Sequence, residues 1–61
     1  MRVGTLLKSL DYNDIGVIYK VTKQELFVRW SRANKTEHIL LIDFNKLIVA
    51  GYMKVLEAEE D

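Results

Sequence analysis

The stretch from Asp14 to Trp30 constrains the fold most, because its apolar residues recur at every second position. That period is typical of β-strands, in which successive side chains point to opposite faces of a sheet. A polar linker at 22–24 divides the stretch into two such runs. The linker lacks Gly and Asn, which tight two-residue turns favour, so we expect a somewhat longer connection. The chain is therefore predicted to fold around a β-hairpin.

Parity along the two runs predicts which side chains fill the core, because alternate residues of a strand share a face. The residues expected to face inward are Ile15, Val17, Tyr19, Val21, Leu26, Val28 and Trp30. Ile18 and Phe27 are then expected to face outward on neighbouring strands, where they mark a protein contact unless other parts of the chain cover them. With Tyr12 from the preceding loop, they are the candidate protein-binding residues.

The rest of the chain supplies three more strands and a helical segment. The expected elements are a strand at 3–8, a loop at 9–14, a polar connection at 31–36, a strand at 37–42, a helical segment of one or two turns at 43–50 and a strand at 52–56. Leu10 and Tyr12 are expected to cap one end of the core. Asp43 is the expected N-cap of the helix and Gly51 its left-handed end. The unbroken apolar run 39–42 predicts a strand covered on both faces or one that contacts another molecule.

This order of elements resembles the SH3-like small barrel, over residues 3–56. The resemblance is carried by Val3-Gly4-x-Leu6, Asp14-Ile15-Gly16-Val17-Ile18, Val28-Arg29-Trp30 and the segment from Asp43 to Leu47. It implies an all-β fold: a small SH3-like barrel of about five antiparallel strands with one short helical turn before the last strand. Similar patterns occur in KOW-type modules, which often contact nucleic acid or the transcription and translation machinery, and in small uncharacterised proteins of tailed bacteriophages.

Peptide-binding members of this architecture carry adjacent aromatic residues in the long loop and a Trp that opens the third strand. Here the loop contains Tyr12 alone, and Trp30 ends its strand. These departures argue against a Pro-rich peptide as the ligand.

The chain has 61 residues, enough for one small domain, and it contains no Cys. Disulfides and thiolate metal sites are therefore excluded, and with a single His neither a structural metal nor a cofactor is expected. Stability must come from packing or association, so a protein partner or a homodimer is expected. No apolar run approaches the roughly 20 residues of a membrane helix, and the first residues do not form a secretory signal. We expect a soluble, cytoplasmic protein without a membrane partner.

The net charge is zero, but the charges are unevenly distributed. Residues 57–61 hold four of the nine acidic side chains, whereas residues 1–56 hold all nine Lys and Arg residues. The predicted organisation is a barrel at 1–56 followed by an acidic C-terminal tail at 57–61, which is expected to be a solvated end.

Arg29, Arg32 and Lys35 form a basic group around Trp30 and are the candidate nucleic-acid-binding residues. Such cations neutralise phosphates, and a patch of this size predicts weak, salt-sensitive binding. Trp30 itself is expected in the core rather than against a base.

No catalytic motif is present. His38 with Asp43 and a Ser has the residue types of a triad, but nothing fixes their geometry, and a small closed barrel is expected to lack the roughly 300 Å³ of a ligand pocket. Neither enzymatic activity nor a small-molecule substrate is expected. The predicted function is a non-enzymatic binding module that acts through protein contacts, with a bacteriophage accessory protein in the host cytoplasm as the implied role. The alternative is a KOW-like nucleic-acid or ribonucleoprotein binder that uses the loop from Arg29 to Lys35.

Overall fold

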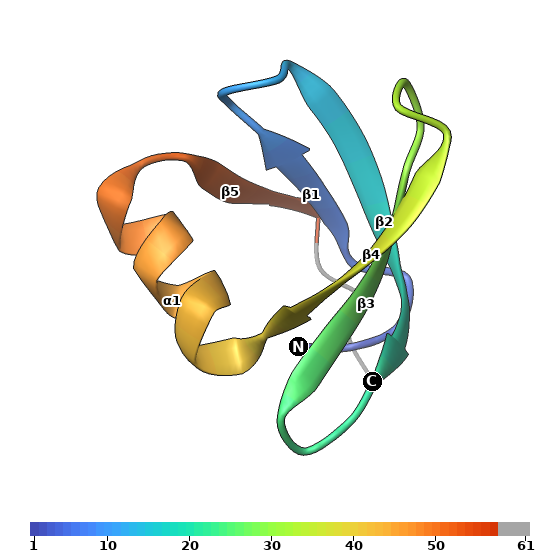
Figure 1. The fold of residues 1–61 in the computed structure, drawn as a ribbon, viewed down its shortest axis with the longest axis vertical. Helices are drawn as coiled ribbons and strands as arrows, with labels where there is room; N and C mark the ends of the chain where they lie inside the picture. Colours follow the sequence, from blue (N-terminus) through green and yellow to red (C-terminus); the bar gives the residue numbers. More distant parts are fainter. Residues whose placement is uncertain (58–61) are drawn as a thin grey trace.

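The computed structural model describes residues 1–57 as one antiparallel sheet and one helix (Figure 1). The elements are β1 (Leu6–Ser9), β2 (Asp14–Val21), β3 (Glu25–Trp30), β4 (Lys35–Leu40), α1 (Leu41–Ala50) and β5 (Met53–Glu57). The strands follow the order β4-β3-β2-β1-β5, and all four pairings are antiparallel. The prediction of an all-β fold with five antiparallel strands and a helix before the last strand is confirmed. The helix has ten residues, more than the one or two turns expected.

Helix α1 lies between the two edge strands of the sheet. It follows β4 directly, contacts both β4 and β5, and buries Phe44 in the core. In Figure 1 the curved sheet wraps around one side of the core and α1 covers the side between β4 and β5. The helix therefore connects the two edges without a β4–β5 pairing among residues 1–57. Within residues 1–57, α1 with its ten residues is too short to span a bilayer, and no other helix is present.

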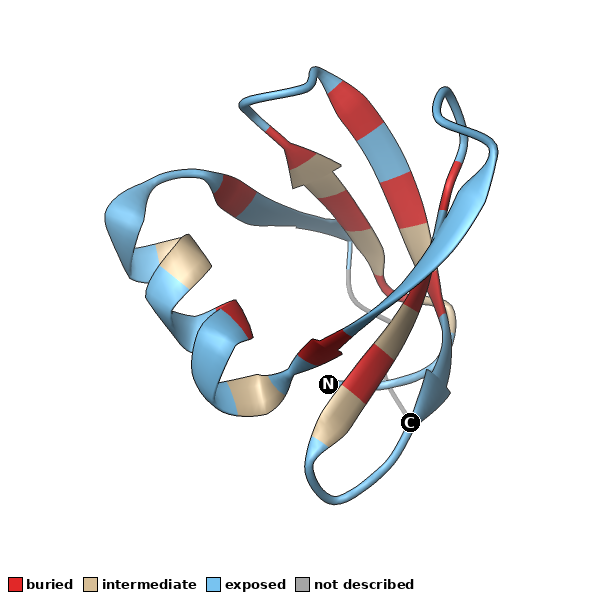
Figure 2. Ribbon diagram, viewed as in Figure 1, coloured by how far each residue is buried: buried red, intermediate tan, exposed pale blue. Residues whose placement is uncertain are grey.

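The core is made by side chains from all five strands and the helix. Its buried apolar members are Leu7, Ile18, Leu26, Val28, Trp30, Ile39, Phe44 and Met53. Figure 2 shows the buried positions alternating along β2 and β3. The inward parity predicted for β3, which includes Trp30, is confirmed.

The parity predicted for β2 is wrong. Ile18 is 0% exposed and belongs to the core, whereas Ile15, Tyr19 and Val21 are exposed. The register explains the inversion, because Gly16 lies opposite Trp30 on the inner face. The inner face of β2 is poor in apolar side chains at this point because the indole fills the space beside the glycine. Hydrophobic alternation alone therefore favours the wrong face.

The run 39–42 is not a strand covered on both faces, because it crosses the junction between β4 and α1. Ile39 is buried at the end of the strand, Leu41 packs against the core from the first helical residue, and Leu40 and Ile42 are exposed. A change from strand to helix rotates successive side chains by different angles, so a continuous apolar run here serves two elements.

The predicted ends of three other elements also shift. β1 begins at Leu6 rather than Val3, which is exposed. Asp43 lies in the first turn of α1, and Leu40 takes the N-cap position without a side-chain cap. Glu57, the first residue of the predicted tail, ends β5, and the remaining tail residues 58–61 lie outside the described part of the chain.

The packing of Trp30 on Gly16 yields a stability prediction. A methyl carbon added at Gly16 would lie 2.6 Å from Val28 Cγ1 and 2.7 Å from Trp30 Cε3. Gly16→Ala is expected to lower the free energy of unfolding by about 1–3 kcal/mol, as overpacking in cores does, and to change the Trp30 fluorescence. Urea titration followed by tryptophan emission measures both effects.

Gly51→Ala is the matched control. Gly51 has φ 86° and no atom within 4 Å of an added methyl carbon, so the substitution strains the backbone without crowding the indole. It is expected to cost about 1–2 kcal/mol and to leave the native emission spectrum unchanged. Unchanged stability and emission in Gly16→Ala would contradict the close packing of Trp30 and Val28 on Gly16.

Candidate functional site

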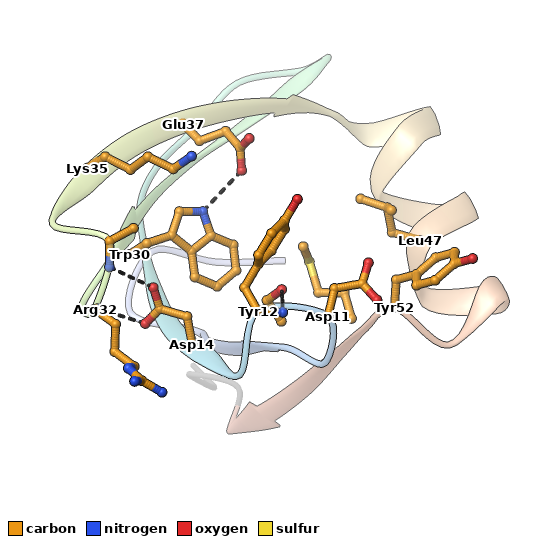
Figure 3. A pocket seen from close by; sticks show the side chains of 12 residues that line it. Asp11, Tyr12, Asp14, Trp30, Arg32, Lys35, Glu37, Leu47 and Tyr52 are labelled. Atoms are coloured by element: carbon orange, nitrogen blue, oxygen red, sulfur yellow. Dashed lines mark hydrogen bonds between the residues drawn. The ribbon is translucent and has the colours of Figure 1, made fainter.

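A cleft of about 650 Å³ opens beside Trp30 (Figure 3). It lies between the loop 10–13 that joins β1 to β2, the turn 31–34 that joins β3 to β4, and the end of α1 with the following turn. The expectation that so small a domain lacks room for a ligand pocket is wrong. The helix holds the two sheet edges apart, which leaves this space at one end of the core.

Three aromatic side chains from separate elements line the cleft. Trp30 is buried at the end of β3, whereas Tyr12 is 83% exposed and Tyr52 is 50% exposed. Figure 3 draws the Tyr12 ring between the indole of Trp30 and the ring of Tyr52. Leu47 and Met53 add aliphatic surface on the side of the helix. The cleft thus has a buried apolar base and two exposed tyrosines at its mouth.

Tyr52 is placed by the predicted end of the helix. Gly51 adopts φ 86°, its N–H donates to the Ile48 carbonyl at 3.1 Å, and the Tyr52 N–H donates to the Leu47 carbonyl at 3.0 Å. This pair of bonds is the Schellman motif, so the prediction for Gly51 is confirmed. The Tyr52 carbonyl then accepts a bond of 2.9 Å from the Leu10 N–H, which joins the turn after α1 to the loop 10–13.

The loop 10–13 does not cap the core as expected. Leu10 is exposed, and Tyr12 stands at the mouth of the cleft. The Tyr12 N–H donates to the Ser9 Oγ at 3.4 Å, and Asn13 takes φ 52°, so the loop turns sharply between β1 and β2.

The indole of Trp30 is fixed at its edge and on its face. Its Nε1–H donates to Glu37 Oε1 on β4 at 3.1 Å, and Gly16 leaves room for the ring on β2. A buried indole N–H normally has such a partner. Glu37 therefore holds the ring at one orientation in the cleft.

Asp14 fixes the turn 31–34, which forms another wall of the cleft. Its Oδ1 accepts from the N–H groups of Ile15 at 2.7 Å and Arg32 at 2.8 Å, and its Oδ2 accepts from the N–H of Ala33 at 2.9 Å. Burial alone would raise the pKa of the Asp14 carboxyl. The N–H groups of Arg32, Ala33 and Ile15, with the Arg32 guanidinium, outweigh it and hold the pKa below the ordinary value of 3.8.

The three predicted nucleic-acid-binding residues are not brought together. Arg32 and Lys35 line the cleft. Arg29 lies on the opposite face of the sheet, where its guanidinium donates to Asn34 Oδ1 at 3.0 Å. The acidic side chains of Asp11 and Glu37 also line the cleft, so its charge is mixed.

The predicted protein-binding residues are also divided. Ile18 lies in the core, so its expected place on the surface is wrong. Phe27 is half-buried on the outer face of the sheet, and Tyr12 stands at the cleft. The outward parity of Phe27 is confirmed, but its neighbour on that face is Tyr19 rather than Ile18.

The residue types of a catalytic triad do not meet. His38 pairs with Glu25 Oε2 at 3.2 Å on the outer face, Ser9 is buried in β1, and Asp43 lies in the exposed first turn of α1. Within residues 1–57, no group of three or more His, Cys, Asp or Glu side chains is arranged to hold a metal ion.

The described residues form a small domain of five strands and one helix, with a cleft lined by three aromatic side chains. Comparison of the chain with family models, curated proteins and solved structures finds no match. Sequence reasoning missed Tyr52 and Glu37 as members of the cleft. The signal for Tyr52 was the Gly51 that precedes it, since the residue after a helix-ending glycine turns back toward the last helical turn.

The hydrogen bonds to Asp14 predict how stability depends on pH. A carboxyl whose pKa is lower in the folded chain stabilises the fold above its unfolded pKa, and this contribution is lost as the pH falls through the folded pKa. The Asp14→Asn variant has one acceptor oxygen and no charge. We expect a lower thermal midpoint than wild type at about pH 7 and a smaller further loss between about pH 5 and pH 2.

The matched control is Asp11→Asn, which removes an exposed carboxylate from the same cleft. Thermal unfolding followed by circular dichroism at each pH gives the comparison. Equal midpoints for wild type and Asp14→Asn at neutral pH would contradict the role assigned to the Asp14 carboxylate.

Proposed function

We propose that this protein is a non-enzymatic binding module that holds an extended segment of a partner protein in the cleft beside Trp30. The observation that carries the proposal is the pair of exposed tyrosines, Tyr12 and Tyr52, at the mouth of a cleft whose base is a fixed, buried indole. Aromatic side chains contribute most to peptide affinity where the surrounding structure is already ordered, because the protein then loses little conformational freedom on binding.

The chemistry of the lining favours a peptide over a polyphosphate. Arg32 and Lys35 line the cleft together with the acidic side chains of Asp11 and Glu37. Phosphates would meet these carboxylates as well as the cations, whereas a peptide has donors, acceptors and apolar side chains that suit a mixed lining. The tyrosine hydroxyls supply further donors and acceptors for a backbone.

An SH3-like barrel is part of this proposal. It is supported by the five antiparallel strands and by the helix that lies between β4 and β5. Two features of the sequence argue against a Pro-rich ligand: the loop contains Tyr12 alone, and Trp30 ends its strand. Tyr52 supplies a second exposed tyrosine from another element, so proline-containing peptides belong among the ligands tested.

The cellular role belongs to the same proposal and rests on the resemblance stated from the sequence. The proposed role is that of a bacteriophage accessory protein acting in the host cytoplasm. The partner is a different protein, with a second copy of the chain as the other outcome of the tests. The alternative function, nucleic-acid binding through Arg29, Arg32 and Lys35 as one site, has less support because Arg29 lies on the other face.

A phage-displayed library of random peptides of about twelve residues tests the cleft. The library is selected on wild-type protein after depletion on the Tyr12→Ala/Tyr52→Ala double variant. Synthetic copies of the selected peptides are then titrated by calorimetry. We expect the double variant to bind them at least about tenfold more weakly, because aromatic residues at the centre of an interface each contribute on the order of 1–2 kcal/mol.

Tyr19→Ala is the matched control, because Tyr19 is also an exposed tyrosine but lies on the outer face of the sheet. It is expected to bind the selected peptides as wild type does. Failure to select any peptide, or equal affinity of the double variant, would overturn the proposed function. Light scattering on the free protein identifies a dimer, and a dimer dissociated by the double substitution would assign the cleft to a second copy.

A further inference from the structure

A cluster of rings covers the outer face of the sheet, opposite the core. It consists of Tyr19 on β2, Phe27 on β3 and His38 on β4, which we call the outer platform. The Phe27 and His38 rings are stacked, with centroids 5.2 Å apart and planes 5° apart. Tyr19 meets Phe27 edge-on at 6.1 Å. The three rings run across three adjacent strands.

A β-bulge in β2 brings a cation to the same surface. Ile18 pairs with Val28 on the inner face, and the next pair is Lys20 with Phe27 on the outer face. Tyr19 and Lys20 therefore both lie on the outer side, although consecutive strand residues normally alternate. Lys20 Nζ lies 5.0 Å from the centroid of the Phe27 ring.

The rings of the outer platform are fixed but accessible. His38 is 66% exposed and Tyr19 is 45% exposed, while Phe27 is half-buried between its neighbours. Glu25 Oε2 lies 3.2 Å from His38 Nδ1 and holds the imidazole over Phe27. One face of the imidazole is covered by the Phe27 ring, which leaves its other face to solvent.

The charges around the outer platform are mostly basic. Lys20 lies beside Phe27, and Arg29 is the next outward residue of β3. Glu25 is the acidic residue on this face of β2 to β4, and it is engaged with His38. Exposed rings with flanking cations suit bases that stack and phosphates that need neutralising.

We propose that the outer platform binds single-stranded nucleic acid, with a base stacked on His38 and phosphates contacting Lys20 and Arg29. The ligand is single-stranded because bases of a duplex are stacked on one another and do not present a free face. This site differs from the basic group predicted from the sequence, because it excludes Arg32 and Lys35 and uses rings on the opposite face from the cleft. It goes beyond the proposed peptide-binding function and does not depend on it.

The test is titration of the full chain with single-stranded DNA of about ten thymidines at low salt, followed by NMR and by fluorescence anisotropy. Amide shifts are expected in β2 to β4 around Tyr19, Phe27 and His38. The His38→Ala/Tyr19→Ala double variant is expected to bind at least about fivefold more weakly, the lower end for loss of a stacked base. The single variant His38→Phe keeps a ring over Phe27 and is expected to retain most of the wild-type affinity.

Two controls separate this surface from the cleft. Tyr12→Ala removes an exposed tyrosine from the cleft and is expected to leave DNA affinity unchanged. Arg32→Gln with Lys35→Gln removes the cleft cations and is expected to weaken binding less than Lys20→Gln with Arg29→Gln. The Lys20→Gln/Arg29→Gln variant should also show a reduced salt dependence.

Four results of the DNA titrations would overturn the proposal. They are no binding at low salt, equal affinity for a duplex of the same length, shifts confined to residues 31–35 and Tyr12, or full affinity in the double variant. Self-association in the absence of DNA that the double substitution abolishes would assign the outer platform to a second copy of the chain instead.

Discussion

The packing of the Trp30 indole beside Gly16 is the contact on which the rest of the domain depends. It joins β2 to β3 on the inner face and fills the space that any larger residue at position 16 would occupy. The Glu37 carboxylate receives the indole N–H and ties the same ring to β4. One side chain thus links three strands of the sheet and forms the base of the cleft. In a domain of this size a large ring can be buried at few other positions, because small cores contain few buried positions.

Much of the fold could be predicted from local pattern, and the exceptions have a common cause. The hairpin, the inward parity of β3 and the left-handed Gly51 are local properties, and the structure confirms them. The parity of β2 depends on a partner, because Gly16 occupies an inward position only in relation to Trp30. The change from strand to helix at Leu41 is likewise invisible in a run where every residue is apolar. Pattern alone cannot identify a partner on another strand.

The candidate site, too, could be predicted only in part from local pattern. Tyr12, Arg32 and Lys35 stood out in the sequence as an aromatic residue or cations in polar loops, but nothing in the sequence showed which of them meet. Tyr52 and Glu37 joined the cleft through tertiary contacts, the first after the turn of the helix and the second by pairing with the indole. The outer platform depends on a bulge, which shifts a cation to the face of the rings and breaks the alternation that sequence reasoning assumes.

The pairing of β1 with β5 predicts the order in which the strands assemble. Every other strand pair joins neighbours in sequence, whereas Leu6 meets Glu57 across nearly the full described length. Closing so long a loop costs more entropy than forming a hairpin, so this pairing is expected to come last as the chain folds. The bond from Leu10 to the Tyr52 carbonyl belongs to the same late step. A chain still emerging from the ribosome can therefore form β2 to β4 and their outer rings first, and it acquires the cleft only after Tyr52 and β5 have been added.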